Sequence, residues 1–206
     1  MAKRPPLDPF PATGPFSILI VDGGDDRRLV DAILGARPNI VHGKDLALDL
    51  QLRNAKDTSG FERAVAVGVV TDCEADPAGR LVSARAAIAQ IPGAPSDLAH
   101  AEVRTVNGRR FGIFLVPDGD TPGGLETLLR RAWGPTPRDR CVDDYLTCVG
   151  PTGATVANRD KAWLKAWTAG AQNPDLRPEQ LIGRDIDPGH STFDPLRSFL
   201  DALVGR

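Results

Sequence analysis

The sequence predicts an α/β fold: a mostly parallel sheet flanked by helices, with a β-hairpin arm and a C-terminal helical cap. Two observations lead to this prediction. Short apolar runs of strand length alternate with segments of helical spacing through the first 90 residues. These runs lack the apolar–polar alternation of a half-exposed strand. Such continuous apolar runs are typical of strands buried on both faces. Strand–helix alternation of this kind builds a parallel sheet that helices cover.

The first two strand–helix pairs are expected before residue 54. Residues 16–21 (FSILIV) form an apolar run, the segment DGGDD breaks it, and helical spacing follows over residues 27–34. Acidic side chains at that point also complement the dipole of a helix that begins there. A short apolar pair at residues 40–41 and the segment DLALDLQLR at 45–53 predict a second strand and helix.

The third pair and the hairpin follow. Residues 64–70 are rich in β-branched side chains and end at Thr71-Asp72, and a helix is expected over residues 80–90. Residues 101–116 contain Asn107-Gly108 between two apolar arms, the signature of a hairpin with a two-residue turn. Four further segments have helical spacing. They are residues 124–133, 138–148, 157–169 and 193–204.

This order suggests three regions: a flexible proline-rich lead at 1–15, an α/β core at 16–136, and a helical region at 137–206 packed on the core. With 41% apolar and 25% charged residues, the 206-residue chain has an ordinary globular balance. No segment approaches the roughly 18 apolar residues of a membrane span, and the lead lacks the apolar run of a signal peptide. We therefore expect a cytoplasmic protein with no membrane partner.

The net charge and the cysteine content limit which ligands and which kinds of site the sequence supports. The net charge of −2 gives no whole-molecule attraction to nucleic acid, so a polyanion would need a local patch of arginines, Arg80 among them. The default expectation for these arginines is a solvated face. Three scattered cysteines do not form a disulfide framework or a paired-cysteine zinc site. The three histidines share no metal-ligand spacing and are expected at the surface or in turns, and the three tryptophans are expected in the core.

The residues that suggest chemistry are carboxylates at strand ends. Asp22 and Asp72 each follow an apolar strand directly, and the carboxyl ends of parallel strands meet at one edge of the sheet. Further acids stand close to these two or after a third strand. They are Asp26, Glu74, Asp76, Asp118 and Asp120. So many carboxylates would repel one another unless a cation neutralised them, and oxygen ligands suit Mg²⁺ or Mn²⁺.

A structural role competes with this interpretation. Aspartates after strands are common in turns and helix caps, because their side chains accept hydrogen bonds from nearby backbone N–H groups. For any one of these acids taken alone, capping or solvation is the commoner role. Three acidic strand ends together favour a metal site.

The motifs resemble those of a known fold family. An acid and glycine after the first strand, an acidic D-x-D-like pair after a later strand and a downstream acidic helix resemble the TOPRIM domain of topoisomerases, primases and OLD-type nucleases. The segments IVDGGDD, VTDCEADPAGR, FLVPDGD, GLETLL and KAWLKAW, in this order, are more similar to a small uncharacterised prokaryotic TOPRIM-like family. The resemblance spans roughly residues 16–204 and implies a TOPRIM-like α/β core.

The resemblance also implies roles for individual residues. Asp22 takes the place of the family's first glutamate and Asp26 that of the acid one turn later, while Asp72 and Glu74 take the D-x-D positions. Glu126 matches the glutamate of the later L-E motif, and Lys161 a basic residue of a C-terminal helix. Two side-chain lengths depart from the pattern, since Asp22 is one methylene shorter than glutamate and Glu74 one longer than aspartate.

We accordingly expect a Mg²⁺-dependent nuclease or related phosphoryl-transfer enzyme, acting on DNA or RNA in DNA processing or phage defence. Asp22, Asp72, Glu126 and Lys161 are its candidate catalytic residues, with Glu126 or Asp26 as base or second-metal ligand and Lys161 neutralising charge. The metal ligands would be Asp22, Asp26, Asp72, Glu74 and Asp76.

Two alternatives belong to other classes. The changed side-chain lengths at Asp22 and Glu74 favour a degenerate TOPRIM module that binds nucleic acid, nucleotide or a protein partner without cleavage. A receiver-like domain with Asp72 as phosphoacceptor would need a lysine at the end of the last strand, where Val116-Pro117-Asp118 stands.

Overall fold

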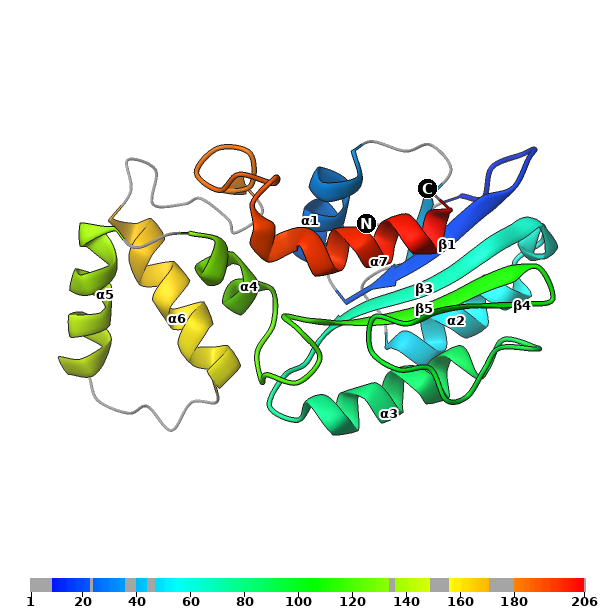
Figure 1. Cartoon of the computed structure of the whole chain (residues 1–206), viewed down its shortest axis with the longest axis horizontal. Helices are drawn as coiled ribbons and strands as arrows, with labels where there is room; N and C mark the ends of the chain where they lie inside the picture. Colours follow the sequence, from blue (N-terminus) through cyan, green and yellow to red (C-terminus); the bar gives the residue numbers. More distant parts are fainter. Residues whose placement is uncertain are drawn as a thin grey trace, which may run out of the picture.

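A five-stranded sheet forms the centre of the molecule (Figure 1). The computed structural model describes residues 9–22, 24–35, 40–43, 47–133, 136–148, 156–170 and 180–205. In spatial order the strands are β2 (Ile40–Gly43), β1 (Phe16–Val21), β3 (Ala64–Asp72), β5 (Arg109–Val116) and β4 (Val103–Val106). Neighbouring strands from β2 to β5 run parallel, and β4 pairs antiparallel with β5 across the Asn107-Gly108 turn. The predicted mostly parallel sheet and its hairpin are confirmed.

The helices follow the predicted order with small shifts at their ends. They are α1 (Gly24–Leu34), α2 (Leu48–Asp57), α3 (Pro77–Ile88), α4 (Leu125–Ala132), α5 (Pro137–Cys148), α6 (Val156–Ala169) and α7 (Asp194–Val204). Short 3₁₀ turns at Phe61–Arg63 and Ser191–Phe193 lead into β3 and α7. Within the described ranges, no helix is both long and apolar enough to cross a bilayer.

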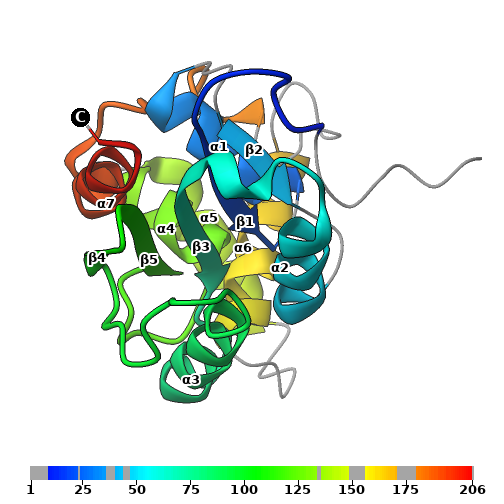
Figure 2. The same ribbon diagram turned by 90° about the vertical axis from the view of Figure 1, so that its right-hand side faces the viewer.

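Both faces of the sheet are covered, which explains the continuously apolar strands. Successive strand residues point to opposite faces. Ile20 of β1 therefore packs in the cluster that contains Leu52 of α2 and Ile88 of α3, whereas Val21 packs in the cluster of α1 and α7. Figure 2 shows α2 and α3 on one side of the sheet and α7 on the other.

The helices after residue 136 take two different places. The last helix, α7, packs on β3, β4 and β5, and a Cβ atom built on Gly68 of β3 would lie 2.3 Å from the Cδ2 atom of Leu203. The absence of a side chain at Gly68 is thus what lets α7 approach the sheet closely. By contrast, α5 and α6 lie beside α4, beyond the end of the sheet (Figure 1).

Aromatic side chains join α4 to α6, and one histidine is placed differently from the prediction. Trp133 lies with its ring centroid 6.2 Å from that of Trp163 and 3.8 Å from that of Trp167, and all three are buried as predicted. His42 is wrongly predicted at the surface: it is 3% exposed, with its Nε2 atom 3.1 Å from a carboxylate oxygen of Asp31. Its position on β2, under α1, buries it.

Candidate functional site

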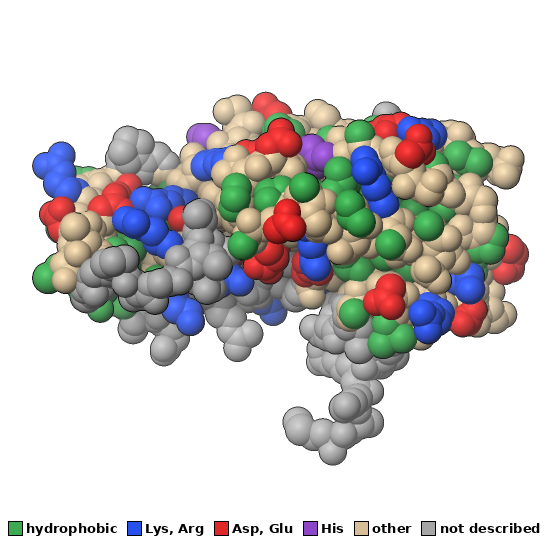
Figure 3. Space-filling view, turned by 90° about the horizontal axis from the view of Figure 1, so that it is seen from below, with side chains coloured by type: hydrophobic (Ala, Val, Ile, Leu, Met, Phe, Trp, Pro, Cys, Tyr) green, Lys and Arg blue, Asp and Glu red, His purple; other side chains and the backbone are tan. Residues whose placement is uncertain are grey.

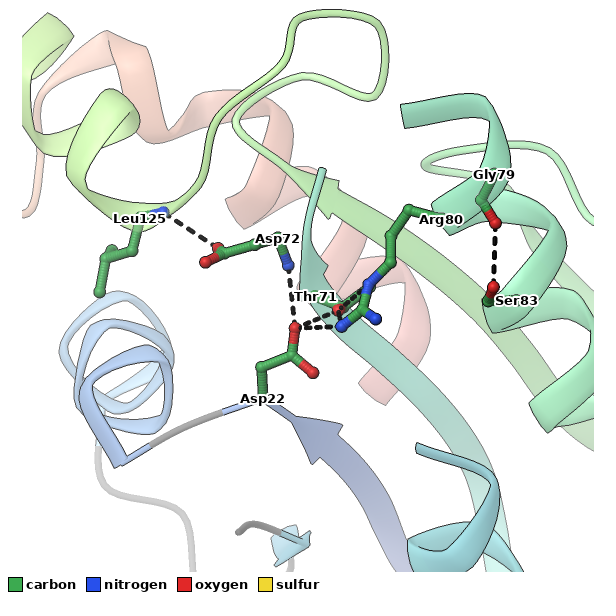
Figure 4. Close-up of polar contacts among 7 residues, drawn as sticks. All are labelled: Asp22, Thr71, Asp72, Gly79, Arg80, Ser83 and Leu125. Carbon is green, nitrogen blue, oxygen red and sulfur yellow. Dashed lines mark hydrogen bonds and ion pairs between the residues drawn. The ribbon is translucent and has the colours of Figure 1, made fainter. Parts of the chain in front are cut away.

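Asp22 lies at the carboxyl end of β1 and turns toward α3. The register pairs Val21 with Val70, so the cross-strand neighbour of Asp22 is Thr71. The Oδ2 atom of Asp22 accepts hydrogen bonds from the Thr71 hydroxyl, from the Asp72 backbone N–H at 3.2 Å and from Arg80 Nη2 at 2.6 Å (Figure 4). This carboxylate is therefore anchored to the end of β3 and to the first turn of α3.

Arg80 is built into the site. Its Nε and Nη2 atoms donate to the Thr71 hydroxyl oxygen at 2.9 and 2.5 Å, in addition to the bond to Asp22. The helix that carries it starts at Asp76, whose side chain accepts a hydrogen bond from the Gly79 backbone N–H at 3.0 Å. This cap sets the position of the first turn, which brings the guanidinium over the ends of β1 and β3. The arginine is thus a fixed positive charge at the sheet edge rather than a solvated side chain.

The backbone of Asp72 lies next to the Asp22 side chain, but the side chain of Asp72 points away from Asp22, toward α4. Its Oδ1 atom accepts a hydrogen bond from the backbone N–H of Leu125 at 3.0 Å, in the first turn of α4. A Cβ atom on Gly124 would lie 2.4 Å from the other carboxylate oxygen of Asp72. The carboxylates of Asp22 and Asp72 therefore diverge, one toward α3 and one toward α4 (Figure 4). The alternation of side chains along neighbouring strands produces this divergence.

The next two acids have distinct environments. Glu74 is exposed and has a positive φ of 55°, and its backbone N–H and C=O each bond to Gly123 at 2.8 Å. This pairing ties the segment after β3 to the segment before α4. Asp76 is the N-cap of α3, which is the capping role that aspartates after strands commonly have. Between them Cys73 is buried, and this burial raises the pKa of its thiol to about 11.

The remaining predicted residues are more dispersed. Asp26 falls within α1, but its side chain lies outside the described residues. Glu126 is half-buried in the first turn of α4, and Lys161 is exposed on α6. After β5, partial burial of Asp118 raises the pKa of its carboxyl. Hydrogen bonds from Thr121, Arg131 and the Asp120 backbone N–H outweigh this effect and lower the pKa to about 2.

The structure thus places Asp22 and Asp72 at the expected edge without clustering the acids. Among the described residues, no three His, Cys, Asp or Glu side chains are grouped so as to hold a metal ion. The metal site stays a prediction. Sequence patterns do not single out Thr71, and they place Arg80 among several arginines expected on a solvated face. A signal existed, because Asp76-Pro77 marks a helix start and places Arg80 in its first turn, just beyond the end of β3.

Comparison with family models identifies the family. A model described as "Protein of unknown function (DUF3226)" matches residues 17–205. The chain belongs to this family. Comparison with curated proteins and with solved structures found no match. Among the described residues, the match covers every strand and helix apart from Phe16 at the start of β1, so the family's shared region includes both α3 with Arg80 and the helices after β5.

A buried network of hydrogen bonds connects the start of α4, beside Asp72, to α6. The Thr127 hydroxyl donates to Asp160 Oδ2 at 2.5 Å and accepts from the Gly124 backbone N–H at 3.3 Å. Asp160 is 6% exposed, and Arg130 reaches its other oxygen at 3.2 Å. Because Gly124 stands against Asp72, α6 is linked through Thr127 to the segment that positions this carboxylate. Sequence patterns give no signal for this network, since Asp160 is 33 residues from Thr127 along the sequence.

A hollow opens next to Asp22, on the side of this residue that faces α2 and α3. Its volume is about 480 Å³, and it lies between the start of α2 and the length of α3, with Asp22 and Arg80 at one end. Figure 3 shows the side of the molecule on which α2 and α3 lie, where acidic, basic and apolar side chains are interspersed. This hollow adjoins the carboxylate that the sequence singled out first.

Proposed function

We propose that the chain is a Mg²⁺-dependent nuclease or related phosphoryl-transfer enzyme with a TOPRIM-like carboxylate site. The observation that carries the proposal is the placement of Asp22 and Asp72 at the ends of two adjacent parallel strands, with Arg80 of α3 paired to Asp22. Parallel α/β sheets bind ligands at this edge. A nuclease site needs carboxylates for a cation and a positive group for the phosphate, and both kinds of side chain are present here.

The donor atoms, rather than their spacing, suit a hard divalent cation. Asp22, Asp72 and Glu74 offer carboxylate oxygens at one edge, and none of the three is fully buried. Oxygen donors with retained water are what Mg²⁺ prefers. When bound, the cation would polarise a phosphate oxygen and lower the pKa of a bound water. Asp22 and Asp72 are its first candidate ligands, followed by Glu74, Asp76 and Asp26.

The chain's own groups supply the rest. Arg80, held by Thr71, presents a guanidinium that can bind a phosphate oxygen and stabilise negative charge as it develops. Asp22 keeps this arginine in place through the 2.6 Å ion pair. Glu126, at the start of α4, is the proposed base, and Lys161 is the proposed additional charge for a DNA or RNA substrate.

The test combines metal binding with cleavage. Wild type, Asp22→Asn and Asp72→Asn are titrated with Mg²⁺ and Mn²⁺ by calorimetry, and each is incubated with single-stranded DNA, duplex DNA and RNA. We expect both variants to bind the cation at least tenfold more weakly and to lose cleavage. Asp57→Asn is the matched control, since this exposed carboxylate ends α2 and does not line the site. Wild type that binds no cation at millimolar concentration would overturn the proposal.

A second candidate is a module that binds nucleic acid, nucleotide or a protein partner without cleaving it. It is favoured by the engagement of the two carboxylates in protein contacts, Asp22 with Arg80 and Asp72 with the Leu125 backbone. The short Asp22 and long Glu74 side chains point in the same direction. Binding of DNA or RNA that depends on Arg80, without cleavage in Mg²⁺ or Mn²⁺, would select this candidate.

A further inference from the structure

We propose that the hollow between α2 and α3 binds the nucleoside part of a nucleotide whose phosphate lies at Arg80. This inference rests on the proposed function, because it names the substrate unit that adjoins the carboxylate edge. The hollow and the edge share Asp22 and Arg80, so a ligand that fills one extends into the other. Its volume of about 480 Å³ falls within the 300–1,000 Å³ of typical small-molecule pockets.

The walls suit a nucleobase. Leu48 of α2 and Ala86 and Ala87 of α3 provide apolar surface without bulky side chains, which leaves room for a flat ring. Ser83 adds a hydroxyl that donates to the Gly79 carbonyl at 3.0 Å, and Gln90 adds an amide whose Nε2 atom donates to the Ala86 carbonyl at 3.4 Å and keeps its oxygen and second N–H for a ligand. An amide both donates and accepts hydrogen bonds, which is the pattern that pairs with the edge of a base such as adenine.

The end of the hollow suits a phosphate. The Nε and Nη2 atoms of Arg80 are engaged by Thr71 and Asp22, whereas Nη1 donates none of the hydrogen bonds found within the described ranges. A guanidinium held in this way loses little conformational freedom when it binds a phosphate oxygen. The position of the arginine therefore sets which end of a nucleotide faces the carboxylates.

The charge of the lining predicts a cation dependence. Asp22 is paired with Arg80, and Asp49 lies 3.9 Å from Arg53, so the hollow has no net positive charge to attract a phosphate dianion. A Mg²⁺ ion at the neighbouring carboxylates would supply that charge. We therefore expect a nucleoside monophosphate to bind more tightly with Mg²⁺ than without it.

The experiment measures binding of adenosine 5′-monophosphate to the full chain by calorimetry, with and without Mg²⁺. In Ala86→Trp the indole fills the hollow, and we expect binding at least tenfold weaker. Gln90→Ala should weaken binding severalfold through loss of the base contact. Val82→Trp is the control, because Val82 is 62% exposed on the same helix and does not line the hollow. Circular dichroism checks that each variant is folded.

The outcomes separate this inference from the proposed function. Weaker nucleotide binding in Ala86→Trp, with binding unchanged in Val82→Trp, supports the hollow as the site. Equal binding in both variants, or none in wild type at millimolar nucleotide, overturns it. The proposed function is judged separately, by Mg²⁺ binding of wild type against Asp72→Asn, because Asp72 faces α4 and does not line the hollow.

Discussion

Replacing Gly124 by alanine tests the contact that positions Asp72. Gly124 has φ −158°, an extended conformation that any residue adopts, so backbone strain does not contribute. The new Cβ atom would lie 2.4–2.8 Å from the three carboxyl atoms of Asp72, which must then move. The carboxylate would lose its 3.0 Å hydrogen bond from Leu125. A hydrogen bond to a charged group contributes about 1.5–3 kcal/mol, and this one is partly exposed, so we expect a loss near the lower value.

The assay is a double-mutant cycle by urea unfolding. Gly124→Ala should lower the free energy of unfolding by about 1.5 kcal/mol in wild type, a decrease of roughly 3–6 °C in Tm for a chain of this length. In the Asp72→Ala background the three nearest atoms are absent, and the same change should cost less than about 0.5 kcal/mol. Gly170→Ala is the control, since the nearest atom to its Cβ among the described residues, chain neighbours aside, is the Trp167 carbonyl oxygen at 3.6 Å. Equal costs in both backgrounds would refute the reasoning.

Three further predictions concern the polar contacts around the site. Arg80→Met should lower the free energy of unfolding by about 1 kcal/mol and tighten Mn²⁺ binding in calorimetry, because the guanidinium no longer occupies Asp22. Thr127→Val should cost about 2 kcal/mol in urea unfolding, because it removes the hydroxyl that donates to the buried Asp160. The folded-state pKa of Asp118 is about 2, below its unfolded value, so its contribution is present above about pH 4 and lost as pH falls toward 2. Since this side chain is 38% exposed, Asp118→Asn should flatten the decline in stability between pH 4.5 and 2.5 by only about 1 kcal/mol.

The fold was largely predictable from the sequence, because its signals are local. An apolar run such as residues 16–21 must be buried on both faces, and this requirement alone predicts a parallel sheet with helices on each side. The Asn107-Gly108 turn fixes the hairpin of β4 and β5 in the same way. Asp76-Pro77 marks the start of α3 through its cap.

The candidate site was predictable only in part. The sequence places Asp22 and Asp72 at strand ends, and the structure has them there. It does not say which face of the sheet each carboxylate takes, because that depends on the register between β1 and β3. This register opposes Asp22 to Thr71 and directs Asp72 to α4. The pairing of Arg80 with Asp22 and the hydrogen bond of Thr127 with Asp160 join segments distant along the sequence, which no local pattern encodes.

The sequence by itself determined the order of strands and helices and the presence of acids at the carboxyl edge of the sheet. These features follow from side-chain periodicity and from residues adjacent in the chain. Only the tertiary structure decided that Asp22 pairs with Arg80 and that Asp72 caps the start of α4. It also decided that α7 packs on the sheet over Gly68, while α5 and α6 lie beside α4 beyond the end of the sheet. The physical reason is that register, helix placement and close packing are set by the whole core at once.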